Sequence, residues 1–388
     1  MMQLDADDER LLAGEFGETR QRLMELLVGL GTVYGAERLV PIASAQVSGA
    51  SYKTIGEWGL EWLSSLDARA VVPAVLNPVG MDLERWQEMG VDPAFAAKQQ
   101  QVVEVYRRLG IRLECTCTPY YLSITSYGDH LAWSESSAVC YANSVIGART
   151  NREGGPSALA AALVGKTPYY GLHLVENRRP TVVVEVEGAP DAPDGGWYGA
   201  LGVLAGREVG TRCPFFRGIR PTRDGLKSLG AAMAASGAVA LFHVDRITPE
   251  ARVFPFETGG LETITFGADE VSAAWSDLPV DAVAIGCPHC SGDELGRVAA
   301  LLAGKRTTKP LYVFAARRVI AEHQAEVAMI ERSGARVYAD TCMVVSPALE
   351  RYGAVMTNSG KASAYMPNMC GAAARLGTLE ECVATATS

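Results

Sequence analysis

The sequence predicts an α/β protein of several lobes whose sheets are mainly parallel. Short apolar runs rich in Val, Ile and Ala alternate with helical stretches of roughly 10–18 residues, and this alternation is typical of parallel sheets covered by helices. A chain of 388 residues is too long for one ordinary core, so we expect two or three lobes. Polar or cysteine-bearing turns follow the predicted strands, at the edge where open α/β sheets bind ligands.

Composition narrows the class of protein further. The chain is 48% hydrophobic and 20% charged, with a net charge of -9 and a pI near 5.2. This acidity argues against a nucleic-acid partner and against an anionic membrane surface. The N-terminus (1–10) is acidic and lacks the features of a signal peptide, and the most apolar stretch (230–244) is too short to span a bilayer. We therefore expect a globular cytoplasmic protein.

The first half of the chain repeats a unit of helix, strand and polar turn. The segment 44–56 is rich in small residues and carries a single lysine, Lys53. Later strands end in Asn77-Pro78 and in the Cys115-Thr-Cys117 turn. In order, the expected elements are a helix over 9–34, a strand over 38–43, a helix over 55–65, a strand over 70–76, a helix over 93–109 and a strand over 111–114.

A central stretch, 133–155, departs from this repeat. It begins as a helix that Ser134 or Ser136 is able to cap, and it ends in the polar loop Arg149-Thr-Asn-Arg-Glu-Gly-Gly155. Five polar or charged residues followed by two glycines do not pack a core. The loop is either a solvated surface with salt bridges or a ligand site that the glycines allow backbone to approach.

The second half returns to α/β alternation after a Pro/Gly/Asp-rich loop at 188–196. We divide the chain into an N-terminal α/β region (1–188), a linker region (189–225) and a C-terminal α/β region (226–388). In order, the expected elements are a helix over 157–164, strands over 180–186, 238–243, 280–285, 311–314 and 337–339, and helices over 226–236, 292–302 and 316–333.

Three of the nine cysteines end predicted strands, namely Cys117, Cys287 and Cys342. Cysteines that converge at strand ends fit a metal centre or an iron–sulfur cluster, and a cluster with three protein ligands leaves one iron open as a Lewis acid. Two alternatives remain. Cys115-x-Cys117 and Cys287-x-x-Cys290 have the spacing of a zinc site, and the thiols could also be unliganded.

Further polar residues surround these turns in the sequence. His289 follows Cys287 by two positions and is either a structural group or a catalyst. The turn Thr357-Asn-Ser-Gly-Lys361 suits an anionic group but lacks the spacing of a phosphate-binding P-loop. Arg149 and Arg152 add positive charge. Motifs of serine hydrolases, zinc proteases and Rossmann dehydrogenases are missing from the sequence.

Taken together, six motifs resemble the aconitase X family in their order, over about residues 8–383. They are Ser48-Gly-Ala-Ser-Tyr-Lys53, Cys117-Thr-Pro-Tyr120, the stretch 133–155, Gly286-Cys-Pro-His289, Asp340-Thr-Cys342 and Thr357-Asn-Ser-Gly-Lys361. Within the family, Asn151-Arg-Glu-Gly-Gly155 and Cys287 resemble the archaeal-type branch, the large subunits of phosphomevalonate dehydratase.

The resemblance implies an aconitase-like fold of several lobes around a central cleft, without the swivel domain. It also implies an iron–sulfur-dependent hydro-lyase that converts mevalonate 5-phosphate to trans-anhydromevalonate 5-phosphate in an archaeal-type mevalonate pathway of isoprenoid biosynthesis. A separate small subunit would form the swivel domain and bring a catalytic serine. The alternatives are a cis-3-hydroxy-L-proline dehydratase of the same family and a non-catalytic RNA-binding or scaffold protein.

Site residues follow from the resemblance position by position. The implied metal ligands, for a 4Fe-4S cluster with one iron that lacks a cysteine, are Cys117, Cys287 and Cys342. The implied catalytic residues are Lys53, Asn143, Ser144, Glu153 and His289. The implied substrate-binding residues are Ser48, Gly49, Ser51, Arg149, Thr150, Asn151, Arg152, Ser359 and Lys361.

Overall fold

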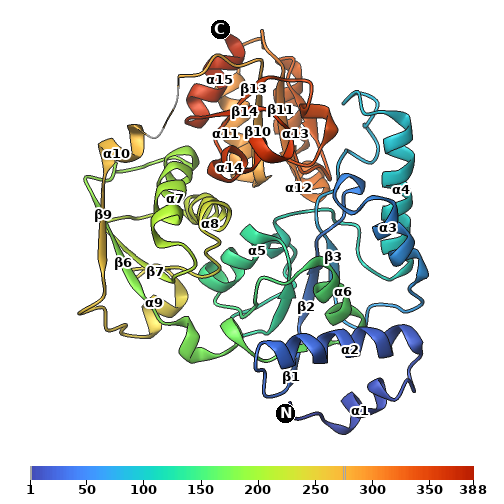
Figure 1. Cartoon of the computed structure of the whole chain (residues 1–388). Helices are drawn as coiled ribbons and strands as arrows, with labels where there is room; N and C mark the ends of the chain where they lie inside the picture. Colours follow the sequence, from blue (N-terminus) through green and yellow to red (C-terminus); the bar gives the residue numbers. More distant parts are fainter. Residues whose placement is uncertain (1, 274, 276) are drawn as a thin grey trace.

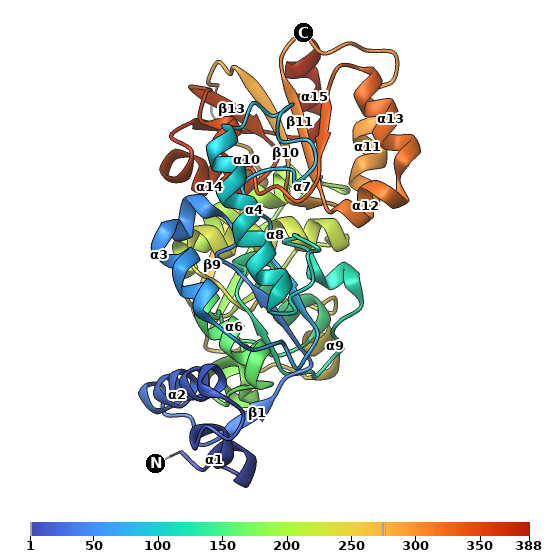
Figure 2. The same cartoon turned by 90° about the vertical axis from the view of Figure 1, so that its right-hand side faces the viewer.

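A computed structural model describes residues 2–273, 275 and 277–388. The chain folds into three lobes, coloured blue to green, yellow-green to yellow and orange to red in Figure 1. The first lobe carries strands β1 to β5, the second β6 to β9 and the third β10 to β14. Figure 2 shows the first lobe with the N-terminus at one end of the molecule and the third lobe with the C-terminus at the other.

The elements have the following bounds. The strands are β1 (Leu39–Pro41), β2 (Ser44–Val47), β3 (Ala74–Leu76), β4 (Leu131–Trp133), β5 (Lys166–Pro168), β6 (Val182–Glu187), β7 (Pro214–Arg217), β8 (His243–Val244), β9 (Thr263–Gly267), β10 (Ala282–Cys290), β11 (Leu311–Ala315), β12 (Arg336–Tyr338), β13 (Ala354–Thr357) and β14 (Ala373–Leu376). The α-helices are α1 (Ala6–Leu12), α2 (Glu18–Val33), α3 (Tyr52–Ser65), α4 (Pro93–Arg108), α5 (Ser136–Tyr141), α6 (Gly155–Val164), α7 (Gly195–Val209), α8 (Arg223–Ser236), α9 (Pro249–Val253), α10 (Ala268–Ala273), α11 (Gly292–Leu302), α12 (Arg317–Glu322), α13 (Gln324–Arg332), α14 (Gly360–Met369) and α15 (Leu379–Thr387). The short helices are η1 (Pro119–Leu122), η2 (Ala142–Ile146), η3 (Gly171–His173), η4 (Val175–Arg178) and η5 (Pro347–Leu349).

The sheets confirm the predicted parallel α/β class. Each lobe has one parallel sheet in the described residues, with strand orders β3-β2-β4, β8-β7-β6-β9 and β12-β11-β10-β13-β14, and the first lobe adds the antiparallel pair β1-β5. Because parallel neighbours need crossovers, helices cover the sheet faces, and inner strands such as β6, β10 and β13 are largely buried apolar runs. Within the same residues, no helix combines the length and apolarity needed to cross a membrane.

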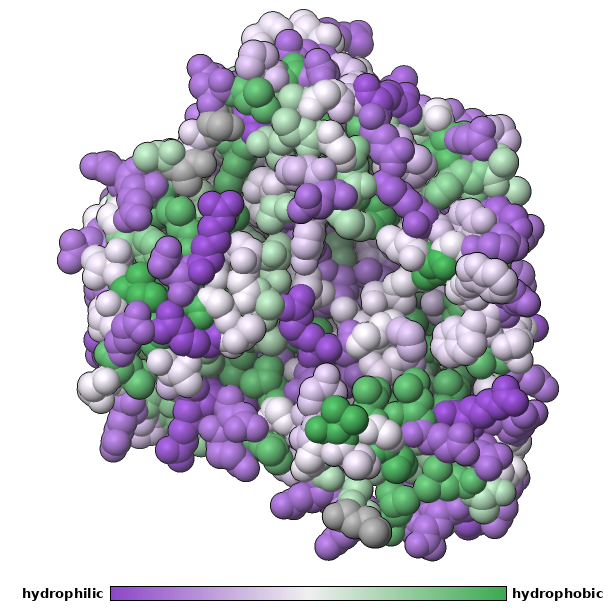
Figure 3. Space-filling view, in the orientation of Figure 1, coloured by the Kyte–Doolittle hydropathy of each residue, from purple (hydrophilic) through white to green (hydrophobic). Residues whose placement is uncertain are grey.

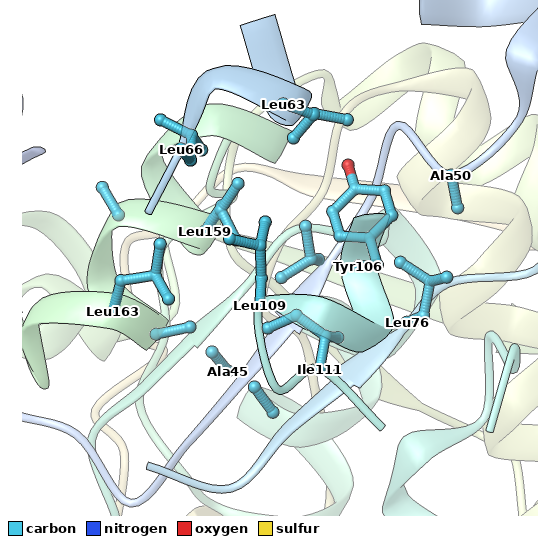
Figure 4. Close-up of a cluster of buried hydrophobic side chains, with 14 of the residues drawn as sticks. Ala45, Ala50, Leu63, Leu66, Leu76, Tyr106, Leu109, Ile111, Leu159 and Leu163 are labelled. Carbon is cyan, nitrogen blue, oxygen red and sulfur yellow. The ribbon is translucent and has the colours of Figure 1, made fainter. Parts of the chain in front are cut away.

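The core of the first lobe lies between its sheet and helices α3, α4 and α6. Leu63, Tyr106 and Leu159 bring the three helices together over Leu76 of β3 (Figure 4). Leu76 and Leu109 are fully buried, and each such side chain contributes about 1.5–3 kcal/mol relative to an exposed position. This packing fixes the carboxyl ends of β2 and β3, from which the first lobe reaches the third.

Two predicted helices are each divided in the structure. The helix expected over 9–34 is α1 and α2, because Gly14 and Gly17 between them have φ of 81° and 97°, which a right-handed helix does not accommodate. The helix expected over 316–333 is α12 and α13, which meet at His323 with φ of -122°. The apolar periodicity of the sequence continues through both breaks, so it predicted one helix in each region where the structure has two.

Predicted strands also differ from the observed ones. The strand expected over 111–114 is reduced to an isolated bridge between Arg112 and Val75. The strand expected over 238–243 is reduced to β8, His243–Val244, and Ala238 takes a φ of 61°. The strand expected over 280–285 is longer and runs through Cys290 as β10, although its pairing with β11 is irregular between Ile285 and Cys290. Gly286 permits this course, since a Cβ there would meet the Phe314 carbonyl oxygen at 2.1 Å.

The region 189–225, which we expected to be a linker, contains helix α7 and strand β7 of the second lobe. Helices α7 and α8 pack closely against each other. A Cβ at Gly202 of α7 would lie 2.6 Å from the Leu229 carbonyl oxygen of α8, so the glycine allows the two backbones to touch. This contact fixes α8, whose first turns reach the cysteine-bearing edge of the third lobe.

Candidate functional site

The three cysteines predicted as metal ligands line one cavity. Its volume is about 30 Å³, and it lies between the first and third lobes. The first lobe contributes Cys117 from the turn before η1, and the third contributes Cys287 from β10 and Cys342 from the turn after β12. The remaining lining residues are Asn77, Pro78, Glu135, Gly286, His289, Met343 and Lys361. Figure 3 shows that the surface is hollowed near the middle of this face, below the third lobe.

Backbone hydrogen bonds join the Cys342 turn to the first lobe. The N–H of Cys342 donates to the Val79 carbonyl at 2.9 Å, and the N–H of Val79 donates to the Asp340 carbonyl at 2.8 Å. Asp340 has a φ of 59°, and its side chain bonds Arg317, which also contacts Asp82 of the first lobe at 3.1 Å. The turn therefore projects Cys342 toward the other two cysteines.

Burial controls the protonation of these thiols. It raises the pKa of Cys287 to about 12 and raises those of Cys117 and Cys342, while nearby Lys361 acts in the opposite direction on all three. A thiolate in this cavity needs more positive charge than Lys361 supplies, and a bound metal provides such charge. In the described part of the chain, no group of three His, Cys, Asp or Glu residues is placed to hold a single ion. Each cysteine of a cluster binds a different iron, so cluster ligands stand farther apart than those of one ion.

Lys361 forms a buried ion pair with Glu135 at the cavity. Lys361 lies in the first turn of α14, behind the N-cap Ser359, and Glu135 is the N-cap of α5. Their side chains are 7% and 6% exposed. Burial by itself raises the pKa of Glu135, but Lys361 and hydrogen bonds from Ser137 (2.6 Å) and the Ala138 N–H (2.7 Å) lower it overall. A fixed cation and a fixed anion therefore face the thiols.

His289 is enclosed beside the cavity. Its side chain is buried, with Nδ1 at 3.3 Å from Thr116 Oγ1 and Nε2 at 2.9 Å from the Thr341 carbonyl oxygen. Burial lowers the pKa of the ring to about 4, so the imidazole is neutral at physiological pH.

Domain models of one family match this chain along nearly its whole length. The Aconitase X first domain matches residues 1–176, the second domain 180–276 and the third domain 280–388. The chain belongs to the aconitase X family.

Relatives and a solved structure agree with this assignment. The phosphomevalonate dehydratase large subunit of Methanosarcina mazei is 54% identical over 100% of this chain and 97% of its own length. The protein of that name from Methanocaldococcus jannaschii is 46% identical over 98% of this chain and 99% of its own. The cis-3-hydroxy-L-proline dehydratase of Pseudomonas aeruginosa is 36% identical over 99% of this chain and 70% of its own. The holo-form crystal structure of Thermococcus kodakaraensis aconitase X superposes with a TM-score of 0.90 at 44% identity, covering 98% of this chain and 99% of that one.

In this aconitase X chain, the side chains of Asn143 and Asn151 bond backbone groups in and around the 149–155 loop. Asn143 donates to the Thr150 and Ala240 carbonyls at 2.9 and 3.0 Å and accepts from the Thr150 N–H at 3.0 Å. Asn151 bonds the Tyr170 carbonyl and the Leu172 N–H. These amide hydrogen bonds hold the loop in place. Neither asparagine is among the residues that line the cavity.

The remaining predicted residues lie at different depths around the aconitase X site. Arg149 donates to the His173 carbonyl at 3.4 Å, whereas Arg152 is exposed. Lys53 reaches the third lobe, where it pairs with Glu350. Others are placed as follows: Ser144 accepts from the Phe242 N–H, Ser48 N–H donates to Ser134, Gly49 has a φ of 79°, Ser51 precedes α3 and is buried, and Ser359 bonds the Cys287 carbonyl.

Two polar side chains of the cavity lining were not predicted as site residues, Glu135 and Asn77. Glu135 follows Trp133-Ser134 at the start of a helix, where an acidic residue favours an N-cap. The sequence did not reveal its role in the cavity, because its partner Lys361 lies 226 positions away. Asn77 follows β3, and its buried Oδ1 has no hydrogen-bond partner in the described residues. The predicted caps Ser134 and Ser136 are replaced by Glu135, because its carboxylate reaches the Ala138 N–H.

Glu153 gives a testable pH dependence. It accepts from Ser157 Oγ at 2.6 Å and Thr167 Oγ1 at 3.2 Å, and burial raises its pKa above 4.5. The folded state then holds a proton that the unfolded state releases, so this group's contribution to stability falls as pH rises from 4.5 through the folded pKa. We expect Glu153→Gln to increase the free energy of unfolding at neutral pH, by about 1.4 kcal/mol per unit of upward shift.

Thermal unfolding of both proteins across this pH range tests the prediction. The difference in stability between the variant and the wild type should grow as pH rises. A difference that is independent of pH would contradict the assigned shift. The activity of the variant reports separately on the catalytic role predicted for Glu153.

Proposed function

We propose that this chain is the large subunit of a hydro-lyase that dehydrates mevalonate 5-phosphate to trans-anhydromevalonate 5-phosphate. The observation that carries the proposal is the meeting of three cysteine-bearing segments from two lobes in one buried cavity, beside the Lys361–Glu135 pair. Relatives of nearly the same length, up to 54% identical, are named phosphomevalonate dehydratase large subunits. A dehydratase of a phosphorylated hydroxy acid needs an activated leaving hydroxyl and cationic groups for its anionic substrate.

An aconitase-like family implies an iron–sulfur cluster, and the residues present fit one. Cys117, Cys287 and Cys342 would hold a 4Fe-4S cluster with one iron free of cysteine. When bound, such a cluster supplies a Lewis acid for the departing hydroxyl. The buried thiols support this assignment because they are unfavourable as bare thiolates, so the cavity suits a cationic group in their midst.

The chain's own residues bind and orient the substrate. Lys361 presents a fixed cation toward the cavity, which attracts a carboxylate, while Glu135 holds that ammonium in place. Arg152 lies exposed on the loop that precedes α6, where it is accessible to a phosphate. Asn143 and Thr150 keep that loop in one conformation through their mutual hydrogen bonds.

A small subunit completes the enzyme in this proposal. The relatives' name "large subunit" implies such a partner. The partner would form the swivel domain and provide a serine that removes the proton from the carbon next to the carboxylate. The large subunit alone should then bind iron without dehydrating the substrate.

Anaerobic co-purification with the small subunit tests the function. We expect a brown complex with about four irons per large subunit that dehydrates mevalonate 5-phosphate, as followed by product formation. The same assay with cis-3-hydroxy-L-proline should give no product. A colourless, zinc-containing complex, or turnover of hydroxyproline alone, would contradict the proposal. Binding of RNA at low salt by an inactive complex would favour the scaffold alternative.

A further inference from the structure

His289 contacts the segments of all three cysteines. Its backbone N–H donates to the Cys117 sulfur at 3.2 Å. Its ring lies between Thr116 and Thr341, which immediately precede Cys117 and Cys342, at 3.3 Å from the Thr116 hydroxyl and 2.9 Å from the Thr341 carbonyl. The third cysteine stands two positions before His289 in β10. One buried side chain therefore joins the three segments that carry the thiols.

The hydrogen bonds of this ring suit a neutral imidazole. Nε2 faces a carbonyl oxygen and therefore carries the proton, which leaves Nδ1 to accept from the Thr116 hydroxyl. Thr116 also accepts from the Thr118 N–H at 3.0 Å, so the ring is connected to the backbone on both sides of Cys117. Both ring nitrogens are thereby occupied by structural contacts.

Lys227 of the second lobe holds His289 from the opposite side. Lys227 is 3% exposed, and its ammonium lies 3.3 Å from the His289 carbonyl oxygen. It pairs with Glu294 and lies 3.4 Å from Asp224. Burial by itself lowers the pKa of Lys227, but the two carboxylates raise it overall, so the ammonium stays charged. A second cavity of about 20 Å³, lined by Lys227, Glu294 and Cys287 among others, borders Cys287 on this side.

The same helix turn reaches the flanks of two cysteine segments. Asp224, in the first turn of α8, accepts from Ser291 Oγ at 2.9 Å, one residue beyond Cys290. It also accepts from the Tyr121 hydroxyl at 3.4 Å, in the short helix η1 that follows Cys117. Helix α8 of the second lobe thus contacts both the first and the third lobe where they meet. The cysteines that line the cavity come from those two lobes.

We propose that His289, anchored by Lys227 of the second lobe, is the positioning residue that sets the spacing of the three cysteine segments. A buried ammonium between two partly buried carboxylates is an expensive way to fill an interface, because apolar side chains of similar volume are often as stable or more so. The ammonium provides a directional contact that an apolar side chain lacks. Its N–H groups point to the His289 carbonyl and to two carboxylates, and this fixes the position of that carbonyl. The proposal rests on the cluster assigned above and specifies which residues give the thiols their geometry.

The test compares two variants with two matched controls in the complex with the small subunit. His289→Asn removes the ring contacts with Thr116 and Thr341. Lys227→Arg keeps the positive charge but changes the group that donates to the His289 carbonyl. His243→Asn removes a histidine that is equally buried and bonded to the Arg178 carbonyl at 2.8 Å in the second lobe, and Lys166→Arg alters a pair with Asp5 and Asp8 near the N-terminus. We expect iron retention during anaerobic dialysis to fall about 10–100-fold in His289→Asn, as for outer partners of metal ligands, and to change little in the controls.

Two further measurements separate positioning from general stability. The visible circular dichroism of the bound cluster should change in His289→Asn even in fractions matched for iron content. In iron-free protein, alkylation of Cys117, Cys287 and Cys342, followed by peptide mass spectrometry, should be faster in His289→Asn than in His243→Asn. Lys227→Arg should stay closer to the wild type than His289→Asn in both measurements, because it preserves the cation.

Each outcome decides between the alternatives. Wild-type iron retention, spectrum and alkylation rates in His289→Asn would overturn the proposal, as would equal changes in His243→Asn. If the wild-type complex binds no iron, the proposed cofactor fails, and the alkylation rates alone still decide whether His289 orders the three segments.

Discussion

The Cys287→Ser variant is expected to lose its iron and its dehydratase activity together. Cys287 lies between the 30 Å³ cavity and the 20 Å³ cavity behind it. Burial already raises the thiol pKa to about 12, and a hydroxyl, whose proton is far less acidic, stays protonated there and does not replace a thiolate ligand. Activity below about one-thousandth of the wild type, a loss of roughly 4 kcal/mol of transition-state stabilisation, is the expected result.

Iron content and initial rates in the co-purified complex measure this effect. The control is Cys382→Ala, since Cys382 is buried in α15 against the third-lobe core and lines neither cavity in the described residues. It should keep the wild-type iron content. Full iron and activity in Cys287→Ser would show that the three thiols do not form the cofactor site.

The Lys361→Met variant is expected to lose both stability and activity. It leaves the buried carboxylate of Glu135 without its cation, and breaking a buried ion pair in this way costs about 3–5 kcal/mol. The double variant Lys361→Met with Glu135→Gln removes the uncompensated charge. It should recover most of the stability, while the hydrogen bonds that cap α5 are only partly retained. Activity should not recover, because the cavity has lost its fixed cation.

Thermal unfolding and steady-state rates of the two variants separate these effects. Lys166→Met provides the control, because Lys166 pairs with Asp5 and Asp8 at a more exposed position near the N-terminus. Recovery of activity in the double variant would contradict the role of Lys361 in the site. Unchanged stability in the single variant would contradict the buried pair.

The sequence predicted the class of fold because apolar runs identify strands locally. The three cysteines were expected at strand ends, but they meet between two lobes, with Cys287 inside β10 and Cys117 in a turn of the first lobe. Glu135 was missed because its role depends on Lys361, which lies 226 positions away. Asn143 was implied by the resemblance alone, and Asn151 also by the polar loop that contains it; in the structure their amides bond backbone groups in and around that loop. Buried backbone N–H and C=O groups need hydrogen-bond partners, and polar side chains of a buried loop provide them.

The errors in the predicted elements have conformational causes. Gly14 and Gly17 interrupt a periodic apolar pattern by adopting positive φ, which periodicity does not reveal. Gly286 does the reverse, since it lets β10 pass close to the Phe314 carbonyl and continue through a segment that reads as a turn. In both cases a missing Cβ decides the path of the chain.

The reciprocal backbone bonds between Val79 and the Asp340–Cys342 turn also have a consequence for biogenesis. The cysteine cavity is not formed within any one lobe, since the first lobe contributes Cys117 and the third contributes Cys287 and Cys342. During synthesis, Cys117 therefore leaves the ribosome long before its companions. A cofactor held by all three thiols can therefore bind only after the third lobe has docked on the first.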